Sequence, residues 1–160
     1  ALRDAVDAHL DQQRMMGREH VVLPAQYVPL AVELEVCAAA SIDPSVVRAR
    51  VLAELRPGSD ARPGWFHPDR LSFGDAVHLG DLLAFVQNIP GVRAVKATRF
   101  APLGDTRGPD VRDVIALGRT AVARLDADPD YPENGTLDVL AIGLDTDAVP
   151  LVVDTGGSSA

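Results

Sequence analysis

Hydrophobic and polar residues alternate most regularly between Val28 and Cys37. Every second residue from Val28 to Val36 is Val or Leu, whereas the positions between them include Glu33 and Glu35. A period of two residues is typical of a strand with one buried face. We therefore predict a strand over residues 28–37. Its Glu33/Glu35 side is interpreted as a solvated face, with an acidic strip that meets a basic neighbour in an assembly as the alternative.

Three other stretches show the period of a helix. The first, residues 2–13, predicts a surface helix with one buried stripe; the stripe consists of Leu2, Ala5, Val6, His9 and Leu10. The second begins at Asp43, a good N-cap, followed by Pro44, whose missing N–H is not needed at the first helical position. Its apolar face is Val47, Val51 and Leu55. The third stretch carries its stripe at Leu79, Leu82, Leu83, Val86 and Ile89.

Turn-forming residues separate the remaining elements. Residues 57–68 form a Pro- and Gly-rich loop, and Pro90-Gly91 turns the chain after the third helix. Strands are expected on both sides of that helix and in the last third of the chain; they cover residues 71–73, 92–100, 111–117, 119–125 and 136–144.

This order of elements predicts an α+β fold, a small mixed sheet with two helices on one face in a ferredoxin-like layout, followed by a β-rich C-terminal extension. We divide the chain into four parts. They are an N-terminal helix and connector (1–23), an α+β core domain (24–104), the β-rich extension (105–154) and a flexible tail (155–160).

Composition narrows the function classes. The chain has 160 residues, of which 47% are hydrophobic, enough for a core, and no window approaches a membrane helix, so a soluble protein is expected. The formal charge of −8 disfavours nucleic-acid binding, which needs clustered Lys and Arg. The single cysteine, Cys37, cannot form an internal disulfide. The chain opens without an initiator Met, which favours a piece cut from a longer polypeptide.

Aromatic residues make up only 4% of the chain, so few Trp and Tyr side chains are available as anchors and any interface is expected to be broad. Trp65 and Phe66 form a bulky pair in a Pro/Gly-rich loop, and such a pair either covers its own core or projects toward a partner. Together with Tyr27 and Tyr131, they are our candidate interface residues.

Candidate chemistry is sparse. Asp126, Asp128 and Asp130 resemble the first ligands of an EF-hand loop, but Tyr131 stands where that loop requires Gly, so a solvated turn is the preferred interpretation. His67 and His78 flank Asp69 and Asp75 without an obvious third ligand. No serine lies in a nucleophile-elbow pattern. We therefore expect no catalytic residue, metal or cofactor. The alternative is a small metal-binding or hydrolytic enzyme domain that uses the Asp126/Asp128/Asp130 loop. A stand-alone module that binds a small ligand is a third hypothesis.

Four segments resemble the baseplate J-like family of phage tails and contractile injection systems, including putative baseplate assembly proteins. They span residues 24–140, most of the chain. In order, they are Pro24-Ala-Gln-Tyr-Val-Pro-Leu-Ala-Val, Gly64-Trp65 before Phe73-Gly74, Ile89-Pro90-Gly91-Val92, and Arg124-Leu-Asp-Ala-Asp-Pro-Asp-Tyr-Pro-Glu-Asn-Gly-Thr-Leu. The family usually runs from Gly-Trp almost directly to Phe-Gly, whereas this chain inserts residues 66–72.

The resemblance implies the C-terminal part of a wedge protein, a structural component and not an enzyme. It implies partners among other wedge and hub proteins and the sheath, with self-association in a ring inside the full assembly. The implied location is the bacterial cytoplasm during assembly and then the tail or injection particle.

Overall fold

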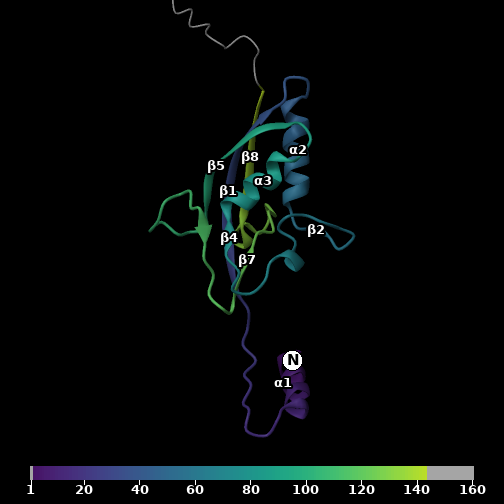
Figure 1. Ribbon diagram of the computed structural model, residues 1–160, viewed down its shortest axis with the longest axis vertical. Helices are drawn as coiled ribbons and strands as arrows, with labels where there is room; N and C mark the ends of the chain where they lie inside the picture. Colours follow the sequence, from purple (N-terminus) through teal and green to yellow (C-terminus); the bar gives the residue numbers. More distant parts are fainter. Residues whose placement is uncertain (1, 144–160) are drawn as a thin grey trace, which may run out of the picture.

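The computed structural model describes residues 2–143, and its central element is the long strand β1 (Gln26–Ala38), which confirms the strand predicted from the alternation. Its even-numbered residues from Leu30 to Ala38 are buried. β5 (Val92–Pro102) pairs antiparallel with β1 on one side. β8 (Thr136–Gly143) pairs parallel with β1 over Ala31–Ala38, and β7 (Ala121–Arg124) pairs parallel with its first residues, 26–29. β1 is therefore the strand that joins the whole sheet (Figure 1).

Two helices supply the other half of the core. In α2 (Pro44–Leu55) the Asp43 side chain accepts a hydrogen bond from the Ser45 N–H at 2.7 Å, so the predicted N-cap is confirmed. α3 (Leu79–Gln87) follows in the chain and packs along β5. The buried helix residues are Val47, Val51 and Leu55 of α2 and Leu79, Leu82 and Val86 of α3. They form one cluster with the even face of β1, which confirms the α+β class with both helices on one face of the sheet.

The segment after Leu103 is β-rich, as predicted, and its strands are β6 (Val114–Ile115), β7 and β8. The parallel neighbours of β1 therefore come from this segment and not from a strand between the two helices. The short strand predicted over residues 71–73 is wrong: these residues lie in a loop, and β4 (Val77–His78) pairs with β6 instead. The predicted tail, residues 155–160, lies outside the described residues.

The loop after α2 turns back onto the end of that helix. It contains a short hairpin, in which the two-residue strands β2 (Gly58–Ser59) and β3 (Arg62–Pro63) pair, and the 3-10 turn Pro68–Arg70. Gly64 lies so close to Arg56 that a Cβ at this position would overlap the Arg56 carbonyl. The next two N–H groups donate to carbonyls of Glu54 and Leu55, and this pairing directs Phe66 into the core. A second 3-10 turn, Pro132–Asn134, precedes β8.

The N-terminal helix α1 (Leu2–Gln13) has the predicted bounds but not the predicted packing. None of its residues is buried, so the expected buried stripe is wrong for this chain alone. The reason is the connector, residues 14–25, which leads away from the sheet. In Figure 1, α1 (purple) consequently lies apart from the sheet and the other helices.

Candidate protein interface beside Tyr27

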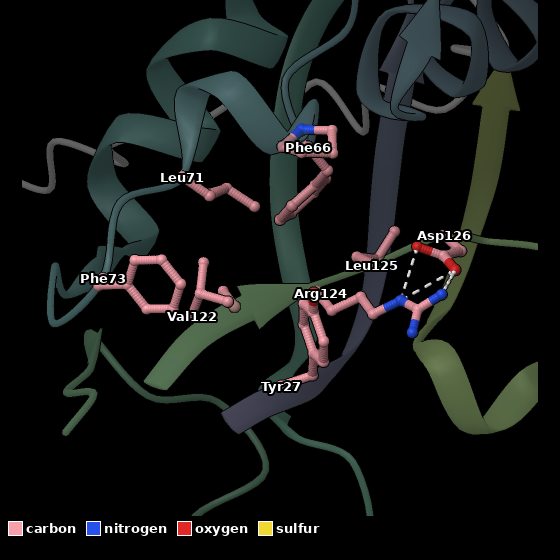
Figure 2. A pocket seen from close by; sticks show the side chains of 10 residues that line it. Tyr27, Phe66, Leu71, Phe73, Val122, Arg124, Leu125 and Asp126 are labelled. Carbon is pink, nitrogen blue, oxygen red and sulfur yellow. Dashed lines mark hydrogen bonds and ion pairs between the residues drawn. The ribbon is translucent and has the colours of Figure 1, made fainter. Parts of the chain in front are cut away.

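A pocket of about 400 Å³ opens where the start of β1, strand β7 and the loop after Phe66 meet. The side chains around it are mostly apolar, and Figure 2 shows Leu71 and Phe66 pointing toward one another across it. Its lining residues are Tyr27, Phe66, Pro68, Leu71, Phe73, Val122, Ala123, Arg124, Leu125 and Asp126. Segments almost 100 residues apart in the sequence thus build one hollow.

Two aromatic side chains at this pocket remain open to solvent. Tyr27 is 61% exposed and Phe73 is 60% exposed, whereas Phe66 at the pocket's inner side is only 2% exposed. Exposed apolar surface is ordinary when it is scattered, but apolar groups gathered around a hollow mark a surface that another molecule can cover. Tyr and Phe also provide large contact area with few rotatable bonds. These features make the pocket a candidate protein–protein contact.

The polar wall of the pocket is already paired. The Arg124 Nε donates to both carboxylate oxygens of Asp126, at 3.1 and 3.0 Å, and its guanidinium lies 5.3 Å from the Tyr27 ring centre. The hydrogen bond to Asp126 raises the pKa of Arg124 above its ordinary value, so this group stays cationic. The Arg124–Asp126 pair holds the guanidinium beside the Tyr27 ring. Because these polar groups already bind one another, apolar contacts are what the pocket offers to another molecule.

The structure brings together two of the four candidate interface residues predicted from the sequence. Tyr27 and Phe66 share the pocket. Trp65 is half-buried instead, with its ring 5.0 Å from that of Phe66 and 6.5 Å from that of Phe85. Tyr131 is 56% exposed in the turn before β8, outside this pocket.

Sequence reasoning missed Phe73, Leu71, Val122 and Arg124 as lining residues. Phe73 carried one usable signal, since it is one of the few large aromatic residues of the chain and stands beside Gly74. Val122 and Arg124 carried none, because a short apolar run does not reveal which strand will lie next to it. Their role depends on the pairing of β7 with the first residues of β1.

The Asp126/Asp128/Asp130 loop is organised by its own side chains. Asp126 binds Arg124, and the Asp128 carboxylate accepts the Asp130 N–H at 3.0 Å, which is the usual use of Asp in a turn. Ala127, between Asp126 and Asp128, has a positive φ of 52°. Within residues 2–143, no three His, Cys, Asp or Glu side chains are grouped so that they could hold a metal ion.

The two candidate histidines, His67 and His78, lie in different parts of the fold. His67 is buried, and its Nδ1 accepts the Asp69 N–H at 3.3 Å at the start of the 3-10 turn. Its Nε2 lies 3.4 Å from an Asp60 carboxylate oxygen. His78 is exposed and precedes α3. The structure therefore does not join them in one site.

The acidic strip on β1 faces basic residues of its own sheet. Glu33 lies 3.8 Å from the Arg99 guanidinium, and Glu35 lies 4.0 Å from the Lys96 ammonium group, both on β5. Each pair joins directly opposed positions of the antiparallel ladder. A basic neighbour would therefore have to compete with cations already in place.

Comparison with known proteins adds no assignment: no family model matches the chain, and neither does any curated protein. No helix in the described part of the chain has both the length and the apolar character needed to cross a membrane.

Proposed function

We propose that this chain is a structural component of the baseplate of a contractile tail or injection system, a wedge protein that acts through protein–protein interfaces. The observation that carries the proposal is the open apolar pocket between β1, β7 and the loop after Phe66. The resemblance of residues 24–140 to baseplate J-like proteins supplies the particular assembly, with other wedge proteins, the hub and the sheath as partners.

The pocket supports this class of function for two reasons. First, Tyr27 and Phe73 present large rigid rings that gain most from being covered. Second, the charged pair Arg124–Asp126 beside them is internally satisfied, so a partner need not supply a counter-charge. An exposed apolar surface next to a fixed polar wall is the usual pattern of an interface core with its rim.

Purification of particles tests the assembly itself. High-molecular-weight particles are pelleted from the organism that encodes the chain, and mass spectrometry asks whether this polypeptide travels with sheath and tube proteins. The proposal expects co-sedimentation at a low, fixed stoichiometry. Recovery of the chain only in the supernatant, while particles are present in the pellet, refutes it.

A pair of matched tyrosine variants tests the pocket. Tyr27 and Tyr131 are exposed to a similar extent, but only Tyr27 lines the pocket. Tyr27→Ala is expected to lower incorporation into particles by about tenfold, the effect of losing roughly 1.4 kcal/mol of contact energy. Tyr131→Ala is expected to incorporate normally. Equal incorporation of the two variants would move the interface away from this pocket.

A further inference from the structure

The helix α1 and the pocket are two apolar surfaces of the same chain that the chain alone leaves uncovered. The three large apolar residues of α1, Leu2, Val6 and Leu10, recur every four positions and therefore form one stripe. All three are exposed, Leu2 to 83%. The pocket offers a hollow of matching character with Phe73 and Tyr27 at its opening.

A helix of this kind needs a partner surface. Isolated helices shorter than about 12–15 residues are marginal in water, because nucleation costs more than a few hydrogen bonds return. α1 has 12 residues, and none of them is buried. Its sequence nevertheless keeps a regular apolar stripe opposite Asp4 and Asp11. Burial of that stripe is what would hold the helix together.

In the structure α1 lies apart from the pocket of its own chain, which favours a second copy as the partner. The His20 Nε2 lies 3.1 Å from an Asp7 carboxylate oxygen, and this contact holds the connector against α1. Only residues 21–25 then separate this unit from β1, a reach of roughly 17 Å when extended. Figure 1 shows the unit apart from the sheet, and the apolar stripe of α1 is open to contact with another molecule.

We infer that α1 of one copy docks its Leu2/Val6/Leu10 stripe into the Tyr27/Phe73 pocket of a second copy. We call α1 together with its connector the arm. The arm joins β1 at Gln26, beside Tyr27, so each arm is attached next to the pocket that receives the arm of the other copy. Two copies can exchange arms in a closed pair, and several can pass them around a ring. Both surfaces belong to one chain, so no foreign partner is required for either.

This inference rests on the proposed function, because it names the partner of the same pocket as another copy of this chain. The two can still fail separately. A chain that is monomeric and yet travels with particles keeps the proposed function and refutes arm exchange. A chain that exchanges arms but is absent from particles refutes the baseplate role alone.

Sedimentation of the full chain over a range of concentrations is the first test. The wild type is expected to self-associate, and Leu10→Asp is expected to weaken association by at least about tenfold, because a carboxylate would enter an apolar hollow. Ala8→Asp is the matched control, since it places the same charge on another face of the same helix. A monomeric wild type, or equal association of the two variants, overturns the inference. Neither substitution touches a buried residue, so the fold is not at risk.

Disulfide trapping then tests which surfaces meet and whether they belong to different molecules. In a Cys37→Ser background, chains with Leu10→Cys are mixed with chains carrying Phe73→Cys and oxidised. Arm exchange predicts a cross-linked heterodimer of the two, and Ala8→Cys in place of Leu10→Cys should give little. A chain that carries both cysteines and closes only within itself would show docking in its own pocket and refute exchange. Absence of any cross-link would refute docking.

Discussion

Phe66 and Phe73 line the same pocket but contribute to different properties of the protein. Phe66 is 2% exposed and belongs to the core cluster, whereas Phe73 is 60% exposed. Replacing a buried Phe by Ala costs about 3–5 kcal/mol, since transfer energy is lost and a cavity remains. For Phe73, about two fifths of the side chain is covered, which corresponds to roughly 1 kcal/mol of the 1.5–3 kcal/mol that full burial supplies.

These two losses of stability correspond to clearly different decreases in melting temperature. At about 2–4 °C per kcal/mol for a chain of this size, Phe66→Ala should melt about 10–15 °C below the wild type and Phe73→Ala about 3 °C below it. Scanning calorimetry, with urea titration for the free energy of unfolding, measures both. Equal losses for the two variants, or a loss below about 1 kcal/mol for Phe66→Ala, would refute the assignment of one ring to the core and the other to the surface.

Phe73→Ala should therefore remain folded at growth temperature while its surface contribution is lost. If the pocket is the interface, this variant is expected to show reduced incorporation into particles with almost unchanged stability. A variant that loses stability and incorporation together would not separate the two effects, so the stability measurement on the same preparation is the control. Normal incorporation of the folded variant would argue against a role of Phe73 in assembly.

Three further predictions concern a glycine turn, a helix cap and the aspartate loop. Gly135 has a φ of 112°, and a Cβ there would lie 3.0 Å from the Leu30 carbonyl oxygen, so Gly135→Ala should lose about 2 kcal/mol or more in urea denaturation. Gly104→Ala, at a positive φ but in open space, should lose clearly less; equal losses would contradict the argument. The hydrogen bonds from Ser45 lower the pKa of the Asp43 carboxyl below its ordinary 3.8, so its stabilisation is present above that value and is lost as the pH falls further. Asp43→Asn should flatten this acid-side change in melting temperature, and an unchanged profile would refute the assignment. Because Asp126 is held by Arg124, millimolar calcium should leave the melting temperature unchanged, whereas a clear rise would revive the metal-binding alternative.

The parts of the fold that the sequence predicted well depend on local signals. The strand β1 follows from strict alternation, and the start of α2 follows from Asp43 and Pro44, which satisfy backbone groups within a few residues. Such signals act over one or two turns of chain, so a single sequence contains them completely. The same applies to the bounds of α1.

The candidate site depends on pairing between distant segments, and no local pattern encodes that. Val122 meets Tyr27 only because β7 pairs in parallel with the first residues of β1, at a separation of about 95 residues. A short run such as residues 121–124 suits several positions in a sheet. The loop with Phe73 reaches the same place because the Gly74 N–H donates to the Ala121 carbonyl. The pocket therefore could not be predicted from the sequence alone.

The exposure of the α1 stripe, which the sequence predicted to be buried, agrees with the proposed assembly. An apolar stripe with helical spacing predicts that a face will be covered, but it does not say which molecule will cover it. In this chain the stripe of α1 is uncovered while an apolar pocket also stands open. If only one of these surfaces were present, it could be a local irregularity without consequence. A regular stripe and a matching hollow on one chain are better explained by an assembly in which each covers the other, so Leu10 and Phe73 should prove to depend on the same contact.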